Sequence, residues 1–233
     1  MAGAATPEPG LFEHLRSRQF LFMLPRAVSL QLMHPAISAA MLEHSPSPGF
    51  VWLHKKRSVP PTIDMAFDPH PESWIPRRIV VTHDTIRGTD ADGHRYHSLD
   101  PQVFHFQHAT YVDSLFETIT RFRGPLDAGE RRSVYASCCR WYRAYGISDA
   151  PLPPTVEDFD AYFRDRTGAL AVTPALTRYR GQLLRPRQWW PAAVPAGAIR
   201  TFLHPAAARA LGARPSAIDR AVSAAFTSAS SLG

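Results

Sequence analysis

The sequence is poor in cysteine: its 233 residues contain only two, and these are neighbours, Cys138 and Cys139. Adjacent cysteines very rarely pair with each other, so the chain has no disulfide framework, and a reducing, cytoplasmic location is the simplest expectation. We expect both thiols to pack in the core or between helices. The N-terminal residues also lack the basic segment followed by an apolar one that marks a signal peptide.

Charge and long apolar runs are scarce as well. Charged residues make up 20% of the chain, against about 25% in an average globular domain. The net charge of +6 comes from scattered arginines, and the one dense basic block is HKKR at 54–57. Because a nucleic-acid-binding protein clusters its positive charge on one face, we expect no nucleic-acid partner. The longest uncharged apolar stretch, 27–42, is shorter than the roughly 20 residues of a membrane span, so we expect a buried helix of a soluble protein and no transmembrane segment.

The common motifs of catalysis and nucleotide binding are missing too. The chain has no HExxH or Cys-x-x-Cys metal motif, no GxSxG nucleophile elbow, no P-loop and no GxGxxG loop. It has eleven histidines instead, several of them in apolar stretches. His105 and His108 lie three residues apart on a predicted helix and could hold a metal, or one could face the core and the other the solvent.

One histidine, His83, lies inside the short apolar stretch IVVTHDTIRG, residues 79–88. On a helix, Ile79, Val80 and Ile86 would share its face. Burying an unpaired polar ring costs about 1–3 kcal/mol, so this ring needs a partner. A backbone carbonyl is the default partner. The alternative is a metal, because a buried imidazole with apolar and aromatic neighbours is what a haem pocket needs.

Helix start and stop signals recur along the chain, whereas strand signals are weak. Asp100 and Pro101 begin a helix that Gly124 ends, and Asp127 with Glu130 forms a capping box for the next one. Further helices are expected from Thr155, from Thr173, at 198–211 and at 216–228. The proline-rich segment 45–76 and the stretch 88–96 are expected to be irregular loops. These signals predict a single all-α domain at 11–228, with disordered tails at 1–10 and 229–233.

Three blocks of sequence carry a resemblance to a known family. They are PRAVSLQLMHPAISAAMLEHS (25–45), HDTIRGTDADGHRYHSLDPQVFHFQHATYVDS (83–114) and RFRGPLDAGER (121–131). Their order and spacing resemble those of the rubber oxygenase (latex clearing protein) family, which includes fungal oxygenases that cleave a prenyl side chain in mycophenolic acid biosynthesis. The resemblance covers about residues 20–214.

The resemblance implies a helical fold with a globin-like core that binds haem b. It also implies oxidation by dioxygen, or peroxide, of a hydrophobic or aromatic substrate of isoprenoid or other natural-product type. The chain has few segments to spare for a polymer-binding surface, so we expect a small molecule instead of rubber. A haem-dependent dehydrogenase or radical-coupling enzyme of a biosynthetic pathway is the alternative, followed by a haem-free helical protein that binds an apolar ligand.

The resemblance also assigns catalytic residues. It places the proximal haem ligand at His83 and the catalytic carboxylate at Glu43, and a carboxylate in an apolar distal pocket would suit proton abstraction. Where the family carries an arginine, a basic residue and a threonine, this chain has His54, Arg57 and Ser58. His54 is the real departure, because histidine is smaller than arginine and titrates. The distal side is therefore expected to treat oxygen or substrate differently.

Three further residues match family positions and are candidates for contact with the cofactor. Arg26, together with Gln31, could meet a haem propionate or cap a buried helix. His34 could face the cofactor, or bond backbone groups that Pro35 leaves free. His108 could be an alternative axial ligand, or a buried histidine that packs beside the haem.

Overall fold

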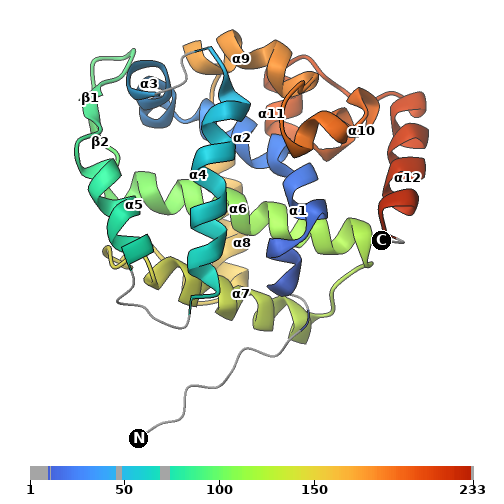
Figure 1. The fold of residues 1–233 in the computed structure, drawn as a ribbon, viewed down its shortest axis with the longest axis horizontal. Coiled ribbons are helices and arrows are strands. Elements are labelled where there is room, and N and C mark those ends of the chain that lie inside the picture. The colour runs from blue at the N-terminus through green and yellow to red at the C-terminus, as the bar shows by residue number, and fades with distance from the viewer. Residues whose placement is uncertain (1–9, 11, 46–48, 69–73, 232–233) are drawn as a thin grey trace, which may run out of the picture.

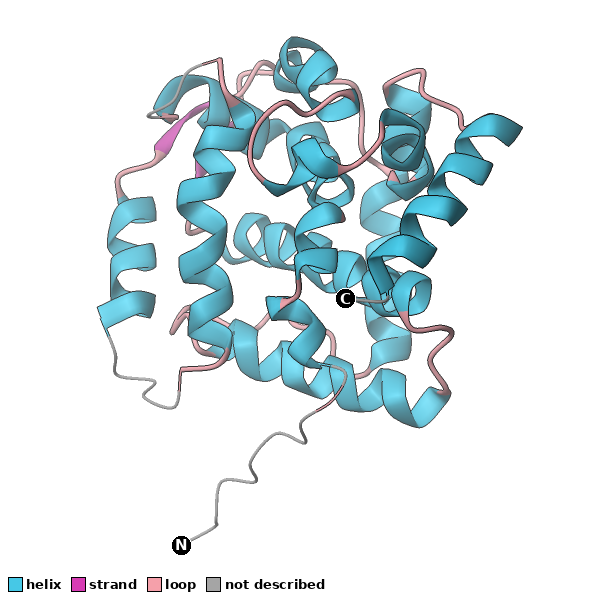
Figure 2. Cartoon of the chain, turned by 45° about the vertical axis from the view of Figure 1, so that its right-hand side comes forward, coloured by secondary structure: helices cyan, strands magenta, loops and turns pink. Residues whose placement is uncertain are grey.

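Helices make up almost all of the regular structure in the residues that the computed structural model describes, which are 10, 12–45, 49–68 and 74–231 (Figure 1, Figure 2). Within these ranges, the strands form a single short hairpin. The prediction of an all-α chain is therefore confirmed. Residues 1–9 of the predicted N-terminal tail lie outside the described residues.

The elements follow one another closely along the chain. In order they are η1 (Phe12–Arg16), α1 (Arg18–Phe22), α2 (Leu24–Met33), α3 (Pro35–His44), α4 (Val51–Ala66), α5 (Trp74–Asp84), β1 (Arg87–Thr89), β2 (Arg95–His97), α6 (Pro101–Phe122), α7 (Ala128–Arg143), α8 (Val156–Gly168), α9 (Pro174–Leu184), η2 (Trp190–Ala193), α10 (Ala196–Phe202), α11 (Pro205–Ala210) and α12 (Ala217–Ser231).

Helix α6 crosses the middle of the molecule, and other helices pack around it (Figure 1). Most of its faces carry apolar or small side chains, which is the pattern of a central helix. The Asp100 carboxylate accepts hydrogen bonds from the backbone N–H groups of Gln102 and Val103, and Pro101 takes the first helical position, as predicted. Every residue of α2 is buried, and α2 packs against α6.

Local capping signals fix the starts of the next three helices. Asp127 and Glu130 form the predicted capping box of α7. The hydroxyl groups of Thr155 and Thr173 accept backbone N–H bonds at the starts of α8 and α9. Both cysteines of α7 are free thiols in the core, as expected.

The prediction of an irregular segment at 45–76 is wrong, because most of it is helical. Helix α4 runs through Pro60 and Pro61, although each proline removes a backbone N–H group and costs about 3 kcal/mol in a helix interior. Trp52, Val59 and Ile63 share one buried face of α4, and their burial outweighs that local cost. Residues 46–48 and 69–73 of the segment lie outside the described residues.

Four other predicted elements differ from the observed ones. The stretch 27–42 is divided at His34, because Pro35 starts the new helix α3. The stretch 88–96 is largely a hairpin, in which Gly88 pairs with Tyr96 and Gly93 takes the positive φ of 85° in the turn. The region 198–211 forms two helices, α10 and α11, and α12 continues to Ser231, into the predicted C-terminal tail.

No helix in the described part of the chain combines the length and the apolar character that crossing a lipid bilayer requires.

Candidate active site

His83 lies near the end of α5 and is half-buried. Its Nδ1 atom is 2.8 Å from the backbone oxygen of Ile79, one helical turn earlier, and its ring packs edge-on against Phe104 of α6 at 5.8 Å between centroids. A carbonyl oxygen can only accept a hydrogen bond, so Nδ1 carries the proton and Nε2 carries the lone pair. The expected carbonyl partner is present, and it leaves the second nitrogen available.

The electrostatic surroundings keep the His83 ring neutral. Burial lowers its pKa, the hydrogen bond to Ile79 opposes that shift, and the positive charge of Lys55 adds to it. A neutral imidazole whose Nδ1–H is held by a backbone carbonyl is the form in which histidine binds metals.

Helix α4 packs beside α5 and brings His54 into electrostatic contact with His83 (Figure 1). The Nδ1 atom of His54 is 3.3 Å from the hydroxyl of Ser45. Burial, followed by the charges of Lys55, His83 and Arg57, lowers the pKa of His54 to about 3. At neutral pH this position is therefore uncharged, whereas the resemblance implies a permanent cation there.

The positive charge inside α4 belongs to the next residue, Lys55, which was not singled out from the sequence. Lys55 is only 6% exposed, and its ammonium donates a hydrogen bond of 2.6 Å to the Oε1 atom of Gln31. Burial lowers the pKa of Lys55 to about 8. The amide of Gln31 donates to the hydroxyl of Thr110 at 2.8 Å, which turns its oxygen toward Lys55. The spacing of Lys55 from Trp52 and Val59 was the available signal, because it places the lysine on the buried face.

The two other residues predicted in this segment differ in exposure. Arg57 is exposed, as is its neighbour Lys56. The hydroxyl of Ser58 is buried, and within the described residues it has no hydrogen-bond partner. Of these two candidates, Ser58 alone presents a buried polar atom that a ligand could satisfy.

Glu43 lies at the end of α3, next to the hairpin. Its side chain is 55% exposed, so the expectation of an apolar pocket around it is wrong. Its Oε2 atom accepts a hydrogen bond of 3.1 Å from the hydroxyl of Tyr96, and burial together with Glu43 raises the pKa of Tyr96 to about 12. Gly88 permits this approach, because a Cβ atom there would lie 2.8 Å from the carboxylate.

Arg26 is engaged within the protein. Its Nε atom is 2.6 Å from Asp113, a second nitrogen bonds the same carboxylate at 3.1 Å, and the third donates to the backbone oxygen of Phe202 at 3.2 Å. These bonds join α2 to α6 and to the end of α10. Of the two alternatives for Arg26, this structure favours the structural one.

His34 and His108 each have a buried Nδ1 atom that lacks a partner among the described residues. His34 makes no side-chain capping bond, so the expected bond to backbone groups freed by Pro35 is not formed. His108 donates from Nε2 to the backbone oxygen of Cys138 at 3.2 Å and packs among aromatic rings. His105 is buried as well. The expectation that one of His105 and His108 faces the core and the other faces the solvent is therefore wrong.

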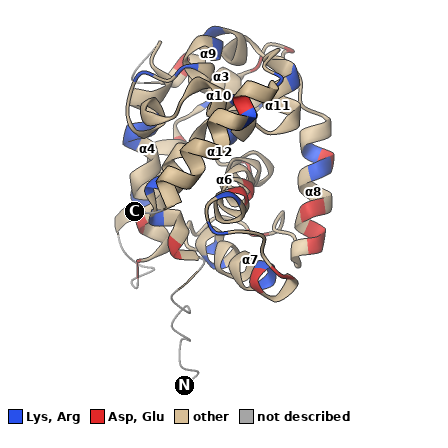
Figure 3. Ribbon diagram, turned by 90° about the vertical axis from the view of Figure 1, so that its right-hand side faces the viewer, with Lys and Arg blue, Asp and Glu red and all other residues tan. Residues whose placement is uncertain are grey.

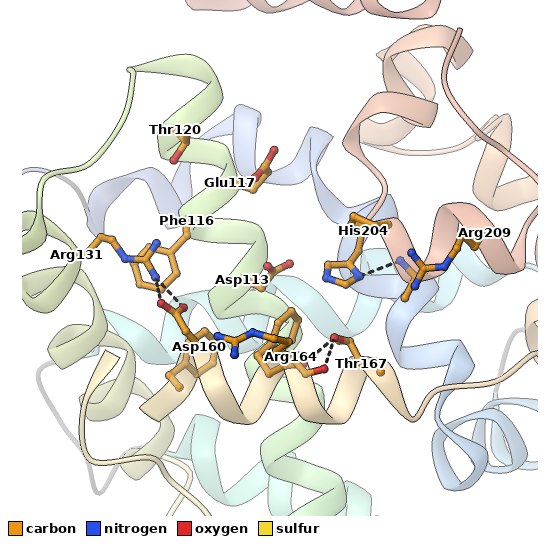
Figure 4. Close-up of a pocket in the computed structure, with 15 residues that line it drawn as sticks. Asp113, Phe116, Glu117, Thr120, Arg131, Asp160, Arg164, Thr167, His204 and Arg209 are labelled. Carbon is orange, nitrogen blue, oxygen red and sulfur yellow. Dashed lines mark hydrogen bonds and ion pairs between the residues drawn. The ribbon is translucent and has the colours of Figure 1, made fainter. Parts of the chain in front are cut away.

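Two open cavities lie along the other half of α6. The one in Figure 4, of about 520 Å³, is bounded by α6, α7, α8 and α11, and none of the predicted site residues lines it. Helix α8 presents both signs of charge, as Figure 3 shows. Asp160 of α8 pairs with Arg131 at 2.7 Å, and Asp113 pairs with Arg26. The second cavity, of about 530 Å³, adjoins Arg26.

Comparison with known protein families identifies the family of this chain. A family model described as "ER-bound oxygenase mpaB/B'/Rubber oxygenase, catalytic domain" matches residues 13–232. The chain belongs to this family. Its membership shows an oxygenase catalytic domain, and therefore an enzyme. No curated protein and no solved structure matches the chain.

The structure shows how the sequence blocks of this oxygenase domain meet. The first block joins the second through three hydrogen-bonded side-chain pairs, which are Arg26 with Asp113, Gln31 with Thr110 and Glu43 with Tyr96. The third block supplies the capping box of α7. The blocks thus form one connected framework, and Lys55 joins it through Gln31.

Proposed function

We propose that this oxygenase domain binds haem b through His83 and uses dioxygen to oxidise a small hydrophobic substrate. The observation that carries the proposal is the state of the His83 ring: it is neutral, its Nδ1–H is held by Ile79, and Nε2 has no partner in the described part of the chain. These are the properties of an axial ligand to haem iron.

The residues near His83 fit a haem group in chemistry as well. Haem, when bound, supplies the redox chemistry that activation of dioxygen requires. The Ile79 carbonyl would orient the ligand ring, and Phe104 would restrict its rotation and exclude water from one side. The buried hydroxyl of Ser58 is a polar atom that a bound group or oxygen could satisfy.

We assign proton transfer to Glu43. Its carboxylate is exposed enough to exchange protons with solvent, and the Tyr96 hydroxyl holds one of its oxygens in place. A carboxylate positioned in this way can accept a proton from a substrate that lies against the hairpin. Glu43→Gln should therefore lower turnover while leaving haem content unchanged.

The surface around α4 and α5 supports an apolar substrate. Exposed large apolar side chains precede or lie on these two helices, namely Phe50, Leu53, Trp74 and Val81. Leu53 directly precedes His54 and Val81 lies two residues before His83 in the sequence, which supports a hydrophobic molecule as the substrate.

Titration of the purified protein with haem tests the proposal. We expect a Soret band that saturates at one haem per chain. His83→Ala should weaken haem binding by about 100-fold or more, because second-shell changes alone cost 10–100-fold. His94→Ala is the matched control, since it removes an exposed histidine of the hairpin. A wild-type protein that binds no haem, or a His83→Ala variant with an unchanged spectrum, would refute the proposal.

The neutral state of His54 supports a second candidate function, which is also oxidative. A neutral imidazole replaces the cation that the resemblance implies at this position. The second candidate is therefore oxidation of the substrate without oxygen transfer, such as dehydrogenation or radical coupling. Turnover under ¹⁸O₂ separates the two candidates. Label in the organic product supports oxygenation, whereas label found only in water supports the second function.

A further inference from the structure

Lys55 is a buried cation without a carboxylate partner in the described residues. Its ammonium has three N–H donors, and one of them goes to the Gln31 amide at 2.6 Å. Gln31 is fully buried and Lys55 almost so. Burying an uncompensated charge costs several kcal/mol, and most proteins avoid that cost by pairing the charge or replacing it with an apolar residue.

The partner of Lys55 preserves its charge. A carboxylate would neutralise the ammonium, whereas the Gln31 amide solvates it and leaves its positive charge in place. The amide cannot easily turn over, because its nitrogen donates to Thr110, whose hydroxyl in turn donates to the backbone oxygen of Gln107 at 2.6 Å. The network therefore holds an acceptor, and only an acceptor, against Lys55.

The charge of Lys55 affects both histidines of the candidate active site electrostatically. It acts on His54, its neighbour in α4, and on His83 of the adjacent helix α5. Lys56 and Arg57, the other charged residues of the HKKR block, are exposed, so water screens them more strongly than it screens Lys55. Lys55 is thus the basic residue of this block that is placed to influence a group bound at His83.

We propose that Lys55 is a positioning residue whose uncompensated charge, held by Gln31, favours the reduced state of the iron group bound at His83. The inference rests on the proposed haem function. One electron from an external reductant, such as dithionite, converts ferric to ferrous haem without breaking a bond in the protein. A nearby positive charge destabilises the ferric state more than the ferrous state, and therefore raises the reduction potential.

Reduction potentials of the haem-loaded protein test this inference. Lys55→Met removes the charge but keeps most of the length of the unbranched side chain. Gln31→Glu keeps the ammonium and gives it a carboxylate partner. Both variants should lower the potential, by a shift of roughly tenfold or more in the ferrous-to-ferric ratio at a fixed applied potential. Lys56→Met removes the same charge from the exposed neighbour and should change the ratio far less.

The outcomes separate the two proposals. A wild-type protein that binds no haem refutes the proposed function and this inference with it. Haem-loaded Lys55→Met and Gln31→Glu proteins whose potentials match that of Lys56→Met refute the inference alone. Circular dichroism and thermal melting report whether each variant folds, and if Lys55→Met does not fold, the potential of Gln31→Glu decides.

Discussion

Two regions of the molecule along α6 differ in the partners of their charged side chains. Toward the end of α6, the carboxylates are paired, Asp113 with Arg26 and Glu117 with Arg121. Around α4 and α5, the buried Ser58 hydroxyl and the Nε2 atom of half-buried His83 have no hydrogen-bond partner in the described residues, and the buried Lys55 ammonium has no carboxylate partner there. Buried hydroxyl groups without a described partner also occur at Ser114 and Tyr162, so the difference between the two regions lies in their charged groups, which are paired at Arg26 and lack a carboxylate at Lys55.

The largest expected effect on stability comes from breaking the ion pair between Arg26 and Asp113. Asp113→Ala leaves the Arg26 guanidinium buried without its anion, which should lower the free energy of unfolding by about 3–5 kcal/mol. Haem affinity of the folded variant should stay close to wild type. Urea denaturation measures the first quantity and haem titration the second.

The double variant Arg26→Met with Asp113→Leu is the control for this pair. Removing both charges should recover much of the lost stability, because no buried charge is left without a partner. An Asp113→Ala protein of normal stability that has lost haem binding would place Asp113 in the haem site. That result would contradict the assignment of the Arg26–Asp113 pair to a structural role.

The neutral buried histidines should give a smaller effect for each unit of pH. Burial lowers the pKa of His108 to about 3, whereas the ring in the unfolded chain titrates near 6.5. Between these values the unfolded state binds the extra proton, so stability is present above pH 6.5 and is lost as the pH falls. Each such histidine should lower the free energy of unfolding by about 1.4 kcal/mol per pH unit in this window.

His108→Leu isolates one of these histidines. Unfolding experiments between pH 6.5 and 4 should give a shallower slope for this variant than for wild type, by the contribution of one proton. Identical slopes would mean that His108 is already protonated in the fold, which would contradict its place in a neutral aromatic cluster.

The smallest expected effect concerns the contact between Glu43 and the hairpin. In Gly88→Ala, the new Cβ atom would lie 2.8 Å from the Glu43 carboxylate and 2.9 Å from the Tyr96 hydroxyl. Loss of their hydrogen bond should cost about 1 kcal/mol of stability and lower turnover at unchanged haem content. Gly168→Ala, where a Cβ atom meets open space, is the matched control in melting and activity assays.

Unchanged turnover in Gly88→Ala, together with a confirmed loss of the hydrogen bond between Glu43 and Tyr96, would remove Glu43 from the proton-transfer role.

Local signals predicted the elements that local chemistry determines. The starts of α6, α7, α8 and α9 follow from Asp100, Asp127, Thr155 and Thr173, whose side chains bond N–H groups within a few residues. Helix α4 was missed because tertiary burial outweighs the local cost of two prolines. Helix propensity alone cannot show that burial of one face of α4 outweighs the cost of its prolines.

The site was harder to predict, because its partners are distant in sequence. Arg26 and Asp113 are 87 residues apart, and Gln31 and Lys55 are 24 apart. His83 could be chosen from the resemblance, and its tautomer follows from the bond to Ile79. The exposure of Glu43 and the burial of Lys55 depend on how α3, α4 and the hairpin pack, which no local pattern encodes.

The role of His83 is tested most directly by removing its side chain and adding free imidazole to the solution. In His83→Gly, haem should bind weakly and without the wild-type spectrum, and added imidazole should restore both the spectrum and a stoichiometry of one haem per chain. A His83→Gly protein that keeps the wild-type spectrum without imidazole would show that another residue holds the haem.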